Sequence, residues 1–128
     1  VPDIRPYLRA ASVVVVPLRI GGGTRVKILV AQAMRRPVVS TTIGAEGLGL
    51  SQGESILLAD DAREFANRVV DLLSDASQSA RITASAWAHA ARHFSWTDIG
   101  ERLSTVLESN IGLTARRDPL PEGKAQVA

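Results

Sequence analysis

A run of four valines constrains the fold of this chain more than any other feature. Val13–Val16 follows Ser12 and is closed by Pro17. Because apolar and polar side chains do not alternate in it, the run predicts a strand that is covered on both faces. Strands of this kind are typical of parallel sheets flanked by helices, so the run predicts an α/β fold.

The pattern of a short apolar run, a loop and a helix then repeats along the chain. Further strands are expected at about 37–40 and 56–58, and helices at 2–11, 24–34, 61–75, 76–94 and 96–109. Alternation at this spacing predicts neighbouring parallel strands that form the second half of a doubly wound sheet. The predicted apolar faces are Val26, Leu29, Val30 and Ala33 on one helix, and Phe65, Val69, Leu72 and Leu73 on another.

Length and composition limit the organisation to one domain. Of 128 residues, 45% are hydrophobic and 4% are aromatic, so aliphatic side chains must build the core. Residues 1–110 are expected to form the domain. Residues 111–128 hold little that could pack and are expected to be a disordered tail. Trp87, Phe94 and Trp96 are expected to act as packing anchors.

The same composition excludes several classes of function. Without cysteine there are no disulfides or thiolate metal sites. His89 and His93 stand one helical turn apart with no third ligand nearby, so no metal site is expected. The net charge of +2 is scattered, which argues against nucleic-acid binding. No apolar run approaches the roughly 18 residues of a membrane span, and no signal peptide is expected.

A glycine-rich loop is the strongest candidate for chemistry. Gly21, Gly22 and Gly23 lie between the valine strand and a helix that begins near Thr24. Free backbone N–H groups at a helix N-terminus suit a phosphate, and Arg25 and Lys27 add positive charge. The alternative is a flexible turn in which Thr24 caps the helix, and strand, loop and helix alone leave both possibilities open.

A second loop follows the next predicted strand. It contains Thr42, Gly44 and Glu46 and is expected at the same edge of the sheet as the first loop. Two glycine-bearing loops at one edge favour a ligand crevice. Glu46 either contacts that ligand or faces solvent, and a single loop carboxylate more often faces solvent.

Several ordered motifs resemble one enzyme family. These are PLRIGGGTRVKIL at 17–29, PVVSTTIGAEGL at 37–48, ILLAD at 56–60 and FSWTDIG at 94–100. Together they resemble the C-terminal lobe of the retaining GT-B glycosyltransferases of family 4, the glycosyl transferases group 1. The resemblance covers about residues 1–110. It implies a partial Rossmann-like sheet and a transferase that holds a nucleoside-diphosphate sugar between two lobes, without a further cofactor.

The resemblance also implies which residues bind the donor. The glycine-loop residues would lie near the sugar and the diphosphate, and the second loop would border the cleft. The first group is Gly21, Gly22, Gly23, Thr24, Arg25 and Lys27, and the second is Thr42, Gly44 and Glu46.

Two positions depart from the family pattern. The family has a glutamate that hydrogen-bonds the ribose where this chain has Val30, and valine accepts no hydrogen bond. This change implies an affinity loss equivalent to about 1–3 kcal/mol. Gln32 should face another side of the helix and substitute poorly for the glutamate. The family also has glycine at the position of Arg35, where a helix end favours left-handed backbone.

The resemblance leaves the acceptor lobe and the first strands of the donor lobe unaccounted for. We expect an open edge beside Val13–Val16, which the missing N-terminal lobe or a second copy of the chain would cover. The chain by itself is expected to transfer no sugar. A cytoplasmic location is expected, with peripheral membrane association as an alternative. The competing hypothesis is a degenerate module that binds nucleotides or proteins without catalysis.

Overall fold

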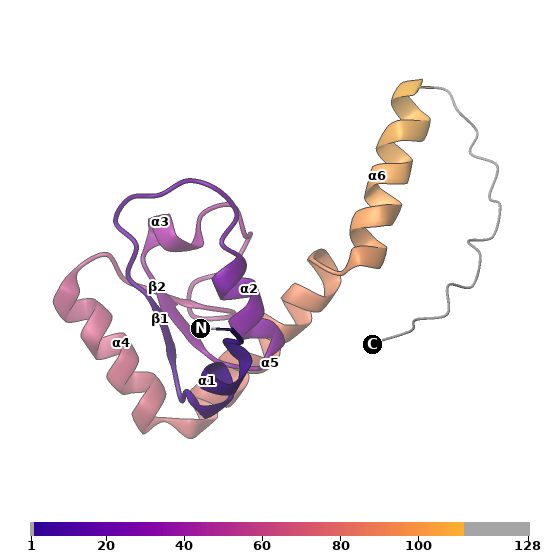
Figure 1. Cartoon of the computed structure of the whole chain (residues 1–128). Coiled ribbons are helices and arrows are strands. Elements are labelled where there is room, and N and C mark those ends of the chain that lie inside the picture. The colour runs from indigo at the N-terminus through magenta and orange to yellow at the C-terminus, as the bar shows by residue number, and fades with distance from the viewer. Residues whose placement is uncertain (1, 112–128) are drawn as a thin grey trace. The chain divides into compact units, whose positions relative to one another are not determined.

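The computed structural model describes residues 2–111, which fall into two units, residues 2–95 and 96–111. The predicted tail from residue 112 onward lies outside the described residues. Figure 1 shows the elements in chain order. They are α1 (Arg5–Ala10), β1 (Val14–Val16), α2 (Val26–Ala33), β2 (Val38–Ser40), α3 (Thr42–Ala45), β3 (Leu57–Leu58), α4 (Ala62–Ser74), α5 (Ala76–His93) and α6 (Trp96–Ile111).

The three strands form one parallel sheet in the order β1-β2-β3. Val14 pairs with Val38 and Val16 with Ser40, and Val39 pairs with Leu57. The predicted α/β class, strand positions and sequential parallel pairing are therefore confirmed. Short strands suffice here because helices cover both faces of the sheet.

Two apolar clusters lie on opposite faces of the sheet. Successive residues of a strand point to opposite sides, so Val38 joins one cluster with Ile28 of α2, and Val39 joins the other with Leu72 of α4. In Figure 1, α2 and α4 accordingly lie on either side of the strands. Helix α5 contacts both α2 and α4, and its Ile82 is fully buried.

The predicted apolar face of α2 is confirmed at Leu29, which packs against the cluster that contains Ile28, and is wrong at Val26. The buried side chains of α2 are Ile28, Ala31 and Gln32, whereas Val26 is 56% exposed. The buried face of α2 thus includes Gln32, a polar side chain outside the predicted apolar face. Gln32 is fully buried, its Nε2 donates to the Ser55 carbonyl, and its Oε1 has no partner among the described residues.

Aspartate side chains cap the N-termini of α4 and α5. Asp61 accepts hydrogen bonds from the Arg63 and Glu64 amides at the start of α4, and Asp75 caps α5 in the same way. A capping carboxylate satisfies amides that have no partner within the helix. On α4, Phe65 and Val69 pack as predicted, but Leu73 is 59% exposed because it lies beyond the edge of the apolar stripe.

Arg35 ends α2 in left-handed backbone. Its φ is 55°, and the amides of Arg35 and Arg36 donate to the carbonyls of Gln32 and Ala31, as in a Schellman helix end. The left-handed backbone expected at this position is therefore present although the residue is arginine. Its guanidinium lies 4.6 Å from the centre of the Trp87 ring, a cation–π contact that offsets part of the backbone cost.

The predicted aromatic anchors differ in their roles. Phe94 packs against the α2-side cluster. Trp87 is exposed beneath Arg35, and Trp96 is 87% exposed on α6, so the anchor roles predicted for these two are wrong. His89 donates through Nε2 to the Leu48 carbonyl at 2.9 Å and lies against His93. Among the described residues, no cluster of three metal-ligating side chains occurs.

Helix α6 forms the second unit. Its exposed apolar side chains recur at helical spacing at Trp96, Ile99, Leu103 and Val106. Across the described residues, no helix has the length and apolar character needed to cross a membrane.

Candidate functional site

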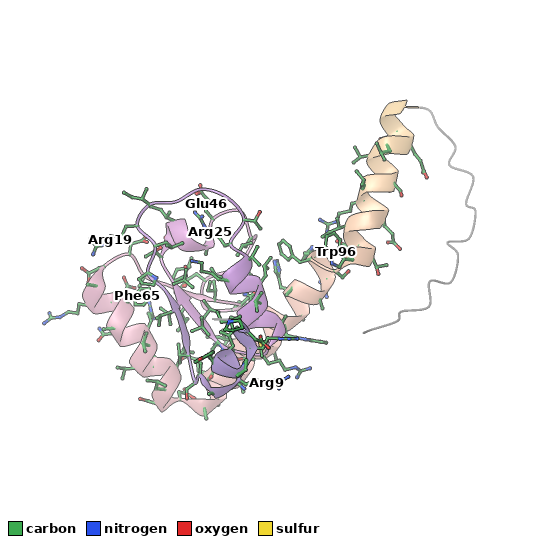
Figure 2. All side chains as sticks on the ribbon, in the orientation of Figure 1. Arg9, Arg19, Arg25, Glu46, Phe65 and Trp96 are labelled. Carbon is green, nitrogen blue, oxygen red and sulfur yellow. The ribbon has the colours of Figure 1, made fainter. Side chains whose placement is uncertain are left out.

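Three loops meet at the carboxyl edge of the sheet. One follows β1 and carries the glycines, the second follows β2 and forms α3, and the third joins β3 to α4. In Figure 2, Arg19, Arg25 and Glu46 all lie at this end of the first unit. The carboxyl ends of parallel strands are where such folds bind ligands.

Arg25 ties the first loop to the second. Its side chain is 5% exposed. Nη2 donates to the Gly21 carbonyl at 2.8 Å and to the Ile43 carbonyl at 3.1 Å, Nη1 donates to Gly22 at 3.0 Å, and Nε donates to Ile43 at 3.3 Å. All three guanidinium nitrogens are engaged with backbone carbonyls. The direct donor contact predicted for Arg25 stays a prediction, and the geometry favours a positioning role.

No ion pair among the described residues includes Arg25. The ion pairs among the described residues join Arg5 to Asp3, Arg68 to Glu64 and Arg102 to Asp98. A buried guanidinium whose acceptors are neutral carbonyls keeps a positive potential. That potential lies directly under the glycine loop and favours an anion above it.

Thr41 makes a second tie between the same loops. Its hydroxyl donates to the Leu18 carbonyl and accepts from the Gly44 amide at 3.0 Å. Gly44 has no room for a side chain, because a Cβ would lie 2.3 Å from the Ser40 hydroxyl oxygen and 3.0 Å from the Val16 carbonyl oxygen. Gly44 was predicted to border the donor. Its amide is already used by Thr41, so its visible role is close packing of α3 on the sheet.

Thr42 connects the second loop to the third. Its amide donates to Asp60 Oδ1 at 2.8 Å and its hydroxyl donates to Oδ2 at 2.7 Å. These two bonds, the hydroxyl bond first, lower the pKa of Asp60 because they stabilise the carboxylate. The three loops therefore form one hydrogen-bonded rim.

A cavity of about 610 Å³ opens at this rim. Its lining comes from all three loops and comprises Leu18, Arg19, Thr41, Thr42, Ile43, Asp60, Asp61 and Ala62. Of the nine residues predicted to bind the donor, Thr42 alone belongs to this lining. The rest of that set lies on the adjoining glycine loop and at the end of α3.

The glycine loop presents free backbone donors. No amide from Gly21 to Lys27 makes a hydrogen bond to another described residue. A Cβ added at Gly22 or Gly23 would meet nothing within 4 Å, so the space above the loop is open. Gly23 also has a φ of 85°, which side-chain-bearing residues rarely adopt. Thr24 and Lys27 are exposed beside it, and α2 has no side-chain cap, so the capping role considered for Thr24 is absent.

Glu46 and Val30 complete the predicted set. Glu46 ends α3 and is exposed. Val30 is partly buried on the second turn of α2 and belongs to neither apolar cluster. A valine that packs in no cluster gains little from burial, so its position is not explained by core packing.

Thr41 and Asp60 contribute to the site but were not among the residues predicted from the sequence. Each of them lies one or two residues after a predicted strand. That position alone indicates the carboxyl edge of the sheet, where ligands bind. Asp60 belongs to the ILLAD motif at 56–60 but was given no role of its own, and its neighbour Asp61 caps α4. Arg19, which lies within the motif at 17–29, also lines the cavity.

A parallel sheet with helices on both faces and a ligand edge built from three joined loops defines a Rossmann-like α/β domain. A family model described as "Glycosyl transferases group 1" matches residues 1–75. The chain belongs to the group 1 glycosyltransferases, and the family predicted from the sequence motifs is confirmed.

Curated relatives agree with this family. The chain is 31% identical over 121 residues to a D-inositol 3-phosphate glycosyltransferase of Thermobispora bispora, covering 93% of the chain and 28% of the relative. It is 30% identical over 114 residues to a GDP-mannose-dependent monoacylated alpha-(1-6)-phosphatidylinositol monomannoside mannosyltransferase of Corynebacterium glutamicum, covering 84% of the chain and 30% of the relative.

A D-inositol 3-phosphate glycosyltransferase 1 of Catenulispora acidiphila is 32% identical over 112 residues, covering 86% of the chain and 26% of the relative. The chain thus spans less than a third of the length of these relatives. No solved structure matches the chain.

Proposed function

We propose that this chain supplies the donor side of a glycosyltransferase and holds the diphosphate of a nucleoside-diphosphate sugar. One observation carries the proposal. The amides of Gly21–Lys27 have no partner among the described residues and lie above the buried Arg25 charge. Free amides at a helix N-terminus and a nearby cation stabilise a diphosphate both in the bound donor and as a leaving group.

The remaining candidate residues have distinct roles in this proposal. Lys27 lies in the first turn of α2 and adds a mobile positive charge next to the loop. Thr42 and Asp60 fix the opposite rim, and Glu46 lies at the end of α3 within the same edge. The name of one relative specifies GDP-mannose, so GDP-mannose is the first donor to test.

We expect Val30→Glu to tighten nucleoside-diphosphate binding by about tenfold to a hundredfold, because a carboxylate there would accept hydrogen bonds from the ribose hydroxyls. Isothermal titration of the 128-residue chain with GDP and UDP measures the change. Ala33→Glu, an exposed position at the far end of the same helix, is the matched control and should leave the affinity unchanged. Equal affinities of Val30→Glu and the unsubstituted chain would contradict the ribose contact.

We further propose that the chain alone transfers no sugar. Transfer requires the acceptor hydroxyl, the anomeric carbon and the diphosphate to be held at reacting distance, and the described residues provide the diphosphate side. Radiolabelled transfer from a panel of nucleotide sugars to mixed acceptors tests this proposal. Turnover above a heat-inactivated sample that is lost in Lys27→Ala would overturn it.

The second candidate is a binding module without catalysis, and Val30 at the family's glutamate position favours it. Adding an acceptor lobe from a relative distinguishes the two candidates. The mixture should transfer sugar if the chain is the donor side of an enzyme, and should not if the chain is a binding module. We also propose a cytoplasmic site of action. Peripheral association with a membrane is the alternative, since one relative's name includes a phosphatidylinositol substrate.

A further inference from the structure

A second cavity lies at the opposite edge of the sheet, where the strands begin. It has a volume of about 500 Å³. Ser12 and Pro37 from the segments before β1 and β2 line it, together with the end of α4, Arg35, Arg36 and the first half of α5. None of the residues assigned to the donor belongs to this lining, so the cavity is separate from the candidate donor site.

Arg36 is the central unpaired group of this cavity. Its Nε is buried and has no hydrogen-bond partner among the described residues, and none of their ion pairs includes it. A buried guanidinium N–H without an acceptor is unfavourable. The planar guanidinium matches the oxygens of a phosphoryl group better than any single carbonyl does.

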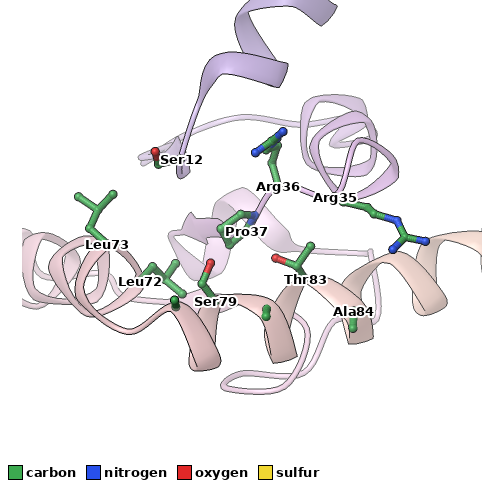
Figure 3. Close-up of a pocket in the computed structure, with 11 residues that line it drawn as sticks. Ser12, Arg35, Arg36, Pro37, Leu72, Leu73, Ser79, Thr83 and Ala84 are labelled. Carbon is green, nitrogen blue, oxygen red and sulfur yellow. The ribbon is translucent and has the colours of Figure 1, made fainter.

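The other polar groups of the lining are also free donors. The hydroxyls of Ser12, Ser79 and Thr83 make no hydrogen bond to a described residue. Figure 3 shows Ser79 and Thr83 pointing from α5 toward Pro37, with Arg36 and Ser12 on the other side. A serine or threonine hydroxyl can donate one hydrogen bond to an anionic oxygen.

Arg35 adds a second positive charge from a fixed position. The Arg35 guanidinium lies over the Trp87 ring, and Figure 3 shows the Arg35 and Arg36 side chains pointing in different directions around the cavity. Strained backbone such as the left-handed conformation of Arg35 is retained where surrounding contacts require it. The cavity is therefore flanked by two guanidinium groups.

No carboxylate lines the cavity. Asp71 and Asp75 adjoin the lining in sequence. The Asp75 carboxylate is occupied by the Ser77 and Gln78 amides, so these two amides at the N-terminus of α5 are not free to bind a ligand. The positive charges of Arg35 and Arg36 are thus not neutralised within the lining.

We propose that this cavity is a second anion site, which binds a phosphomonoester group through Arg36, Ser79 and Thr83 with Arg35 at its rim. The group belongs either to a free phosphorylated metabolite or to a lipid headgroup. This site acts independently of the donor site, and its ligand requires no nucleotide. It also accounts for the left-handed arginine at a position where glycine would cost less.

The test is an NMR titration of the ¹⁵N-labelled 128-residue chain with inorganic phosphate, against chloride at equal ionic strength. Saturable shifts are expected at the amides of Arg36, Ser79 and Thr83. Shifts at Gly21–Gly23 report the donor loop separately, so failure of one site is distinguishable from failure of the other. Phosphatidate vesicles, compared with phosphatidylcholine vesicles, then distinguish a lipid headgroup from a free phosphomonoester.

Arg36→Gln should weaken phosphate binding at this cavity by at least about tenfold. Arg63→Gln removes the same charge from an exposed position on α4 and should leave binding unchanged. If Arg36→Gln does not fold, the double variant Ser79→Ala and Thr83→Val is measured instead. It should also weaken phosphate binding at this cavity. Absence of saturation up to about 20 mM phosphate, or equal weakening by Arg36→Gln and Arg63→Gln, would overturn the proposal.

Discussion

Arg25 illustrates how one residue organises the site. Sequence spacing placed it beside the glycine loop as a cation that could contact the donor. In the structure the side chain points inward and its nitrogens bind the carbonyls of Gly21, Gly22 and Ile43. It therefore fixes the loop conformation and supplies charge from below, which distinguishes it from the exposed Lys27.

We expect Arg25→Met to lower the free energy of unfolding by about 2–3 kcal/mol, because it removes hydrogen bonds from a charged donor and leaves loop carbonyls unpaired. Urea denaturation followed by circular dichroism measures the change. Arg19→Met is the control, since Arg19 is exposed in the same loop and should change stability little. Equal midpoints for the two variants would show that Arg25 does not hold the loops together.

At the scale of elements, the rim depends on how the segments after β2 and β3 are joined. Asp60 connects them, because both of its carboxylate oxygens accept hydrogen bonds from Thr42. Asp60 is exposed, so the contact is sensitive to protonation in solvent. The loop that carries Thr42 and Glu46 is expected to depend on this contact for its order.

The pKa of Asp60 predicts how the stability contributed by the Thr42–Asp60 contact changes with pH. The folded-state pKa of Asp60 lies below its ordinary value of 3.8. Its stabilising contribution is therefore present above pH 3.8 and is lost as the pH falls through the lower folded-state pKa. Asp60→Asn should remove this part of the acid dependence of unfolding, and Asp71→Asn on α4 serves as the control. If both variants retain the acid dependence of the unsubstituted chain, the Thr42–Asp60 contact is not present in solution.

At the scale of the whole molecule, β1 and β3 are the edge strands of the described sheet, and β1 is the edge that follows α1. β1 pairs with β2 alone among the described strands, and Val15 is 50% exposed on it. An edge strand with free backbone groups and apolar side chains tends to pair with another strand. This edge is where the rest of a donor lobe or a second copy of the chain would add strands.

The isolated chain is expected to self-associate through β1 as its concentration rises. Val15→Lys should shift it toward the monomer, because a charged side chain on an edge strand opposes pairing. Sedimentation velocity over a range of concentrations measures the change in mass. Val70→Lys places the same charge on an exposed position of α4 and should not alter association. A monomer at every concentration, or equal masses for the two variants, would contradict pairing through β1.

The sequence by itself determined the class of fold, the order of the elements and the family. Continuous β-branched runs such as Val13–Val16 predict buried parallel strands because both faces must be covered. Glycine loops after those strands indicated the ligand edge, and the helix end at Arg35 indicated left-handed backbone. These signals are local, so they can be recognised within a few neighbouring residues.

Only the tertiary structure decided which side chains face the core and which face the ligand edge. Gln32 is buried and Val26 is exposed because the packing of α2 against β2 and α5 decides which side of the helix is buried. The polarity of the individual residues does not decide it. The roles of Arg25, Thr41 and Asp60 arise from partners between 18 and 23 residues away in sequence. Local patterns do not encode such contacts, because the separation is set by how the strands pair and how the helices pack.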